Sequence, residues 1–197
     1  CLHGFASTGD TSNKCKVIKC EFEDETVLTP TYCTFDPEAA SKALSDALES
    51  HIEQHPNDDI TIIGVSLGGF WARWLAKTST SCPRLILINP LIHANNLQKR
   101  VGENVNFGTG EPFVLTQVKA DELSNYEIEL DDPETPITVF LNMDDDDLDP
   151  SIADDLYSDR ADVRRYATGG HRFPQIEEAI PIIRKSMNTL AHYPAGE

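Results

Sequence analysis

Three short apolar runs constrain the fold of this chain more than any other feature. They are Ile60–Val65, Arg84–Asn89 and Ile137–Asn142. Continuous apolar runs of this length are typical of parallel strands that are covered on both faces. Because helical patterns alternate with these runs, the order predicts an α/β fold with a mostly parallel central sheet, right-handed crossovers and helices on both faces. The predicted helices are Pro37–Gln54, Leu67–Lys77, Pro150–Tyr157 and Pro174–Ala191.

Weaker signals complete this outline. Val163–Ala167 and Thr26–Thr29 are further strand candidates. The first motif begins at residue 2 and no methionine precedes it, so we expect a first strand that is largely truncated. The stretch 90–136 is too short for an independent domain and is expected to form a small cap or an irregular excursion over the carboxyl edge of the sheet, where ligands bind in such folds. Residues 1–197 are therefore expected to form a single domain.

The charge of the chain excludes several kinds of partner. It has 33 acidic and 16 basic residues among 197, which gives a formal net charge of −17. Such a chain repels phosphate backbones and anionic lipids, so we expect no nucleic-acid or membrane partner. No apolar run approaches the roughly 20 residues of a membrane helix. The five cysteines are odd in number and lack C-x-x-C spacing, which argues against a zinc site and predicts reduced thiols in the cytoplasm.

The segment Gly64–Gly68 has the pattern G-x-S-x-G. It directly follows a predicted strand and opens a predicted amphipathic helix, which is the context of a nucleophile elbow. There the serine occupies a strained turn with positive φ, and glycines flank it because strand and helix approach closely. We therefore predict Ser66 as a nucleophile, against the simpler interpretation of a glycine-rich turn with a capping serine.

A serine nucleophile needs a base and an acid. His171 is the predicted base, because Gly169 and Gly170 allow a tight loop after the weak fourth strand. The acid should follow a strand and lie between Ser66 and His171. The run 144–147, four aspartates after the third apolar run, supplies it, and the sequence leaves all four open. The other histidines lie on a polar helix, in a loop or in the tail: His51, His55, His93 and His192.

Two backbone amides are predicted to bind the oxyanion. One is the N–H of Leu67, the residue after the nucleophile. The other is the N–H of Phe5, in the turn that follows the truncated strand, where Gly4 allows close backbone approach. His3 in the same turn is expected to be structural rather than a base.

The sequence offers two candidates for residues that contact the substrate. Trp71 lies on the helix after Ser66 and is a candidate for the acyl pocket, although core packing is the alternative. Phe70 and Trp74, spaced i and i+4 on that helix, are expected to pack in the core. His93 follows the second apolar run in a loop and is a second candidate for lining the site.

These motifs together resemble the α/β-hydrolase superfamily, and more narrowly the small bacterial YqiA-like serine esterases. The similarity covers nearly the whole chain in order, and its specificity comes from the combination of motifs. It places the acid at Asp145, although Asp144 stands where the family has glycine. It also implies a serine esterase with a minimal lid that needs no cofactor or metal. The motifs are Leu2–Phe5, Gly64–Trp71, Leu87–Leu91, Asp144–Asp149 and Gly169–Phe173.

The leading hypothesis is a serine carboxylesterase that hydrolyses small, short-acyl esters through an acyl-enzyme intermediate. A thioesterase or acyl-transferase would use the same residues with a different leaving group. A non-catalytic binding module with a hydrolase-like fold is the third possibility, which the complete serine, acid and histidine set disfavours.

Overall fold

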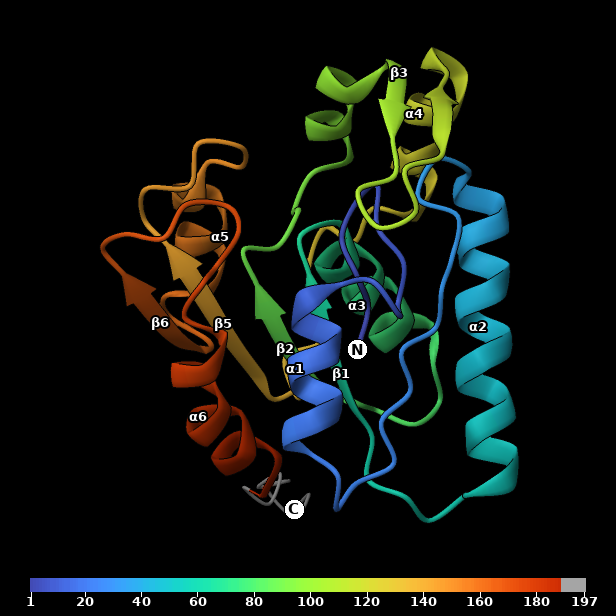
Figure 1. Cartoon of the computed structure of the whole chain (residues 1–197). Helices are drawn as coiled ribbons and strands as arrows, with labels where there is room; N and C mark the ends of the chain where they lie inside the picture. Colours follow the sequence, from blue (N-terminus) through green and yellow to red (C-terminus); the bar gives the residue numbers. More distant parts are fainter. Residues whose placement is uncertain (189–197) are drawn as a thin grey trace.

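The computed structural model describes residues 1–188 and has a four-stranded parallel sheet at its centre (Figure 1). The strand order is β1-β2-β5-β6. A single parallel bridge joins Leu2 to Gly64 beside β1, at the end of the predicted first strand. The α/β fold with a parallel sheet is therefore confirmed. The strands are β1 (Thr61–Val65), β2 (Arg84–Ile88), β5 (Ile137–Asn142) and β6 (Asp162–Tyr166).

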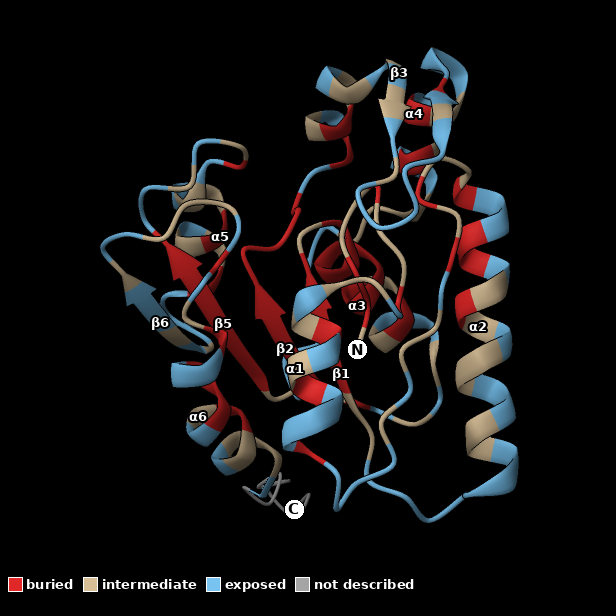
Figure 2. Ribbon diagram, viewed as in Figure 1, coloured by how far each residue is buried: buried red, intermediate tan, exposed pale blue. Residues whose placement is uncertain are grey.

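Helices cover both faces of the sheet. Side chains along each strand point alternately to the two faces, so each strand contributes to both cores. Leu85 and Leu87 belong to one core cluster, whereas Ile86 and Ile88 belong to the other. Consequently β1, β2 and β5 are buried almost throughout (Figure 2). One face packs against α2 (Pro37–Gln54), α3 (Leu67–Thr78) and α5 (Pro150–Tyr157), and the other against α1 (Asn13–Glu21) and α6 (Ile176–Asn188).

Capping residues set where two of these helices begin. Asp36 accepts a hydrogen bond from the Ala39 amide at 3.3 Å, and Pro37 takes the first helical position of α2. Helix α5 begins in the same way: Asp149 is its N-cap and accepts a hydrogen bond from the Ser151 amide, and Pro150 takes the first helical position. Both helices therefore start at the predicted residues.

The short elements between residues 94 and 126 lie beyond the carboxyl edge of the sheet (Figure 1), and the chain then returns to the amino end of β5. The stretch 90–136 contains an antiparallel hairpin flanked by short helices, and Leu97, Leu115 and Leu123 anchor it in the core. A buried ion pair between Arg73 and Asp131, at 3.0 Å, ties its far end to α3. Its elements are η1 (Ala94–Arg100), β3 (Gly102–Val105), β4 (Pro112–Leu115), α4 (Gln117–Glu122) and η2 (Leu123–Tyr126).

Three features differ from the sequence prediction. Helix α1 was not anticipated, because only Cys15 and Ile18 on it are buried and its apolar face is narrow. Residues 26–29 form no strand. Helix α6 begins at Ile176, and the predicted continuation through residues 189–191 falls outside the described part of the chain.

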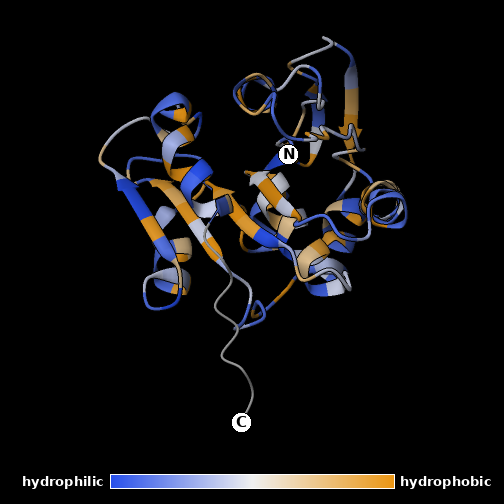
Figure 3. Cartoon of the chain, turned by 90° about the horizontal axis from the view of Figure 1, so that it is seen from below, coloured by the Kyte–Doolittle hydropathy of each residue, from blue (hydrophilic) through white to orange (hydrophobic). Residues whose placement is uncertain are grey.

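The apolar residues concentrate in the central strands when the sheet is seen from below (Figure 3). Within residues 1–188, no helix has the length and hydropathy needed to cross a bilayer.

Candidate active site

A cavity of about 330 Å³ lies at the carboxyl edge of the parallel sheet. Ser66, Leu67 and His171 all line it, together with Phe5 from the first turn and Asp147 from the loop after β5. Ser66 directly follows β1, and His171 follows β6. Parallel strands deliver their following residues to one edge, which explains why side chains 105 positions apart meet here.

Ser66 occupies a strained turn between β1 and α3, with φ 55° and ψ −120°. The flanking glycines permit this turn. A Cβ on Gly64 would lie 2.4 Å from the Gly68 carbonyl oxygen, and one on Gly68 would lie 2.3 Å from the Leu2 carbonyl oxygen. The close approach of strand and helix predicted from G-x-S-x-G is therefore present.

The His171 ring joins Ser66 to Asp145. Its Nε2 lies 2.9 Å from Ser66 Oγ, and its Nδ1 lies 2.8 Å from Asp145 Oδ2. The Asp145 side chain is only 2% exposed, whereas that of His171 is 22% exposed. The buried carboxylate thus orients a ring whose other nitrogen faces the serine and the cavity.

Asp145 is itself held by the turn that follows it. Its Oδ1 accepts hydrogen bonds from the backbone amides of Asp147 at 2.9 Å and Leu148 at 3.0 Å. Oδ2 is left to face the histidine. This turn distinguishes Asp145 from the other aspartates of the run 144–147, which the sequence alone left open.

Asp144 supports the histidine loop from the other side. Its carboxylate accepts hydrogen bonds from the amides of Gly169 at 3.1 Å and Gly170 at 2.8 Å, and these bonds, that from Gly170 foremost, lower the pKa of Asp144. Both glycines have positive φ, 139° and 58°. Asp144 therefore anchors the loop that carries His171.

Asn89, at the end of β2, is a second anchor of this loop. Its Nδ2 donates to the carbonyls of Gly170 and His171 at 3.1 and 3.2 Å, and its Oδ1 accepts from the Asn142 amide at 2.9 Å. Asn142 also donates from Nδ2 to the Gly170 carbonyl at 2.8 Å. The buried amides thus connect the ends of β2 and β5 to the histidine loop.

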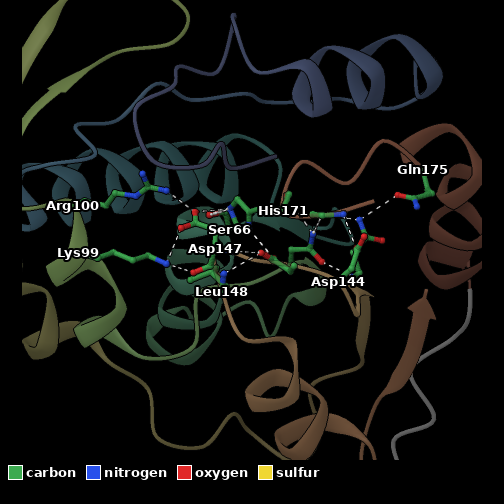
Figure 4. A network of polar contacts seen from close by, with 12 residues as sticks. Ser66, Lys99, Arg100, Asp144, Asp147, Leu148, His171 and Gln175 are labelled. Atoms are coloured by element: carbon green, nitrogen blue, oxygen red, sulfur yellow. Dashed lines mark hydrogen bonds and ion pairs between the residues drawn. The ribbon is translucent and has the colours of Figure 1, made fainter. Parts of the chain in front are cut away.

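Asp147 places a second carboxylate near the ring, with Oδ2 3.6 Å from His171 Nε2. Lys99 and Arg100 from η1 each reach this carboxylate at 2.7 Å (Figure 4). Burial acts to raise the pKa of Asp147, but the Lys99 hydrogen bond and the charges of His171 and Arg100 hold it below its usual value. Asp147 therefore stays ionised and is shared among three basic groups.

The predicted oxyanion donors lie beside the serine. Phe5 and Leu67 both line the cavity, and Gly4 brings the first turn so close that a Cβ there would lie 3.4 Å from Ser66 Cβ. Neither the Phe5 nor the Leu67 amide donates to an acceptor within residues 1–188. Both N–H groups are therefore left without a protein partner at the edge of the cavity.

Two predicted substrate contacts are not brought to this cavity. Trp71 is 1% exposed and packs edge-on against Phe70 and Trp74, because it lies on the core side of α3. The His93 side chain is 50% exposed, pairs with Glu127 Oε1 at 2.9 Å and does not line the cavity. The structure therefore corrects both assignments.

His3 is fully buried and has a structural place in the first turn. It stacks on Tyr32 with ring centroids 4.2 Å apart and accepts a hydrogen bond from the Tyr32 amide at its Nε2. Burial lowers its pKa to about 4, so the ring is neutral at physiological pH.

Sequence reasoning missed several residues around the site. Asn89 lies in the motif Leu87–Leu91, but the sequence does not indicate that it binds the histidine loop. The sequence likewise does not indicate that Asp144 anchors this loop. Lys99 and Arg100 could not be placed, because their position depends on how 90–136 folds. All five cysteines have free thiols in the structure, and in the described part of the chain no group of three or more His, Cys, Asp or Glu side chains could hold a metal ion.

The chain is similar to curated bacterial proteins over part of their length. It is 37% identical over 91 residues to a UPF0227 protein of Pectobacterium atrosepticum, which covers 45% of this chain and 48% of the relative. A UPF0227 protein of Shewanella woodyi is 24% identical over 184 residues, 93% of this chain and 95% of the relative. The matched part of the chain spans about half the length of the two Pectobacterium relatives.

Solved structures share the fold at low sequence identity. Est1E from Butyrivibrio proteoclasticus, solved with ferulic acid bound, has a TM-score of 0.71 at 11% identity, covering 94% of this chain and 86% of that one. Mouse alpha/beta hydrolase domain-containing protein 10 has a TM-score of 0.64 at 16% identity, covering 92% and 86%. The model of the uncharacterised protein family UPF0227 matches residues 1–187. This chain, with its α/β-hydrolase fold, therefore belongs to the UPF0227 family.

Proposed function

We propose that this protein is a serine hydrolase that cleaves small carboxylic esters through an acyl-enzyme intermediate. The observation that carries the proposal is the continuous hydrogen-bonded chain from Ser66 Oγ through the His171 ring to the buried Asp145 carboxylate. A serine hydroxyl becomes a useful nucleophile at neutral pH only with such a base, and the base needs an acid that fixes its tautomer.

In the first half of the reaction, Ser66 Oγ attacks the ester carbonyl while His171 Nε2 takes its proton. Asp145 stabilises the imidazolium that forms. His171 then donates this proton to the leaving alcohol, and the acyl group stays on Ser66. In the second half, His171 takes a proton from the water that attacks the acyl-enzyme and returns this proton to Ser66 Oγ as the acid is released.

The oxyanion formed in each half needs preorganised donors. The unpaired N–H groups of Phe5 and Leu67 supply them in this proposal. Leu67 is also the first residue of α3, so the positive end of that helix points toward the same developing charge.

Two further observations support ester hydrolysis. Several structural neighbours are described as hydrolases or esterases, among them a lipase-esterase related protein from Clostridium acetobutylicum. The cavity of about 330 Å³ lies near the lower end for small-molecule sites and suits a short acyl group better than a long chain.

The proposal is tested with 4-nitrophenyl esters of increasing acyl length, each paired with the corresponding thioester. We expect oxygen-ester hydrolysis with kcat/KM highest for acetate to butyrate and lower for decanoate, because the cavity limits the acyl group. A preference for long acyl chains contradicts the substrate size. A preference for thioesters indicates the thioesterase alternative, and no hydrolysis of any ester contradicts the proposed function.

A further inference from the structure

The cavity beside Ser66 collects basic side chains in a chain that is otherwise acidic. Lys14, Lys99, Arg100 and Arg172 line it, and among the described residues Asp147 is the only acidic one that does so. The whole chain has 33 acidic and 16 basic residues. A quarter of the basic residues therefore lie around one cavity, with one of the 33 acids.

Two of these four cations share one carboxylate. Lys99 Nζ lies 2.7 Å from Asp147 Oδ1, and Arg100 lies 2.7 Å from Asp147 Oδ2 (Figure 4). Lys99 and Arg100 therefore already have an anionic partner on the η1 side of the cavity.

The other two cations have no such partner. No carboxylate within residues 1–188 pairs with Lys14 or Arg172. Lys14 is half-buried, and its pKa is lowered first by burial and then by the positive charge of Arg172. Two like charges near each other without an anion are unfavourable for the free protein, and a bound anion would relieve this repulsion.

The start of α1 adds to the positive potential at the same wall. Ser12, Asn13 and Lys14 all line the cavity, and α1 begins at Asn13 with Ser12 as its N-cap. The amide N–H groups at a helix start carry partial positive charge that favours an anion. Lys14 on this helix and Arg172 on the histidine loop therefore line the same cavity.

We propose that Lys14 and Arg172 form a subsite that binds a negatively charged group, carboxylate or phosphate, on the substrate of Ser66. Arg172 directly follows His171 in the chain, so the bound charge lies close to the reacting ester. The inference rests on the proposed function, which it makes more specific: the substrates are anionic esters rather than neutral ones.

Hydrolysis of matched esters tests the subsite. Charge on the acyl side is probed with 4-nitrophenyl hemiglutarate against 4-nitrophenyl pentanoate. Charge on the leaving group is probed with 3-carboxy-4-nitrophenyl acetate against 4-nitrophenyl acetate. We expect at least one anionic ester to have the higher kcat/KM of its pair. We expect Lys14→Gln and Arg172→Gln each to lower the ratio of kcat/KM for the anionic ester to kcat/KM for its neutral partner. The expected fall is roughly tenfold or more, because each variant removes a charge-assisted contact.

Lys16→Gln is the matched control, because Lys16 lies on the same helix, is exposed and does not line the cavity. It removes the same charge and should leave the ratio unchanged. Equal rates for neutral and anionic esters in both pairs overturn the inference. An equal fall of the ratio in Lys14→Gln and Lys16→Gln also overturns it, because the effect would then be one of net charge.

Binding to the Ser66→Ala variant separates the subsite from the chemistry. Calorimetry with monoethyl glutarate, inorganic phosphate and the neutral ethyl pentanoate should show tighter binding of at least one anion, weakened about tenfold when Lys14→Gln is added. If no ester is hydrolysed but this binding is seen, the proposed function fails and the anion subsite stands. If neither anion binds more tightly than ethyl pentanoate, the subsite is wrong even for an active esterase.

Discussion

Replacing Ser66 with alanine is expected to lower kcat for short-acyl esters on the order of 10⁵- to 10⁶-fold, the range seen when a serine nucleophile is removed. The residual rate would come from the oxyanion donors and substrate binding alone. Because the side chain becomes smaller in a cavity wall, the fold should be unaffected, which circular dichroism and the melting temperature check.

Ser50→Ala is the matched control, since Ser50 is exposed on α2 and does not line the cavity. It should keep full activity. If Ser66→Ala retains more than about a hundredth of the wild-type rate, another group is the nucleophile.

Asp145→Asn is expected to lower kcat by about 10⁴-fold, as in triads where the acid is replaced by its amide. The surrounding turn makes this effect strong. The amides of Asp147 and Leu148 donate to one carboxylate oxygen, so the asparagine must keep its oxygen there and turn its NH₂ toward His171 Nδ1. The ring then carries its proton on Nε2 and cannot accept one from Ser66.

Asp147→Asn is the informative comparison, because Asp147 also lies near the ring, 3.6 Å from Nε2. It loses the ion pairs with Lys99 and Arg100, but the Nδ1 partner of His171 remains. We expect its kcat to fall by less than about tenfold. A larger loss in Asp147→Asn than in Asp145→Asn would show that the acid is assigned to the wrong residue.

Three parallel strands, β1, β2 and β5, could be predicted closely from sequence, because each is a continuous apolar run and burial on both faces demands that pattern. Strand β6 gave a weaker signal, because it is charged and largely exposed. Helix α2 was as predictable as the three apolar strands, since Asp36 and Pro37 mark its start. Helix α1 was not, because it buries only two residues and depends on packing against α6. Local signals therefore determined the centre of the fold and left its periphery open.

In the site, Ser66 and His171 were predictable because a strand or a glycine pair places each one locally. Asp145 could be chosen from the four aspartates only through the family resemblance. Its distinguishing contacts are tertiary or turn-specific: Oδ2 contacts His171 Nδ1, and Oδ1 accepts from the amides of Asp147 and Leu148. The partners Lys99 and Arg100 follow from how 90–136 folds over the sheet edge, a tertiary effect without a local signal. The assignment of Trp71 to the acyl pocket was wrong, because the spacing of residues on α3 does not show which side of the helix faces the cavity.

The role of Ser66 as nucleophile is tested by labelling the folded wild-type protein with a fluorophosphonate, followed by peptide mass spectrometry. We expect one covalent adduct, located on Ser66, that forms slowly or not at all in His171→Ala. An unlabelled folded protein, or an adduct on a different serine, would contradict this role.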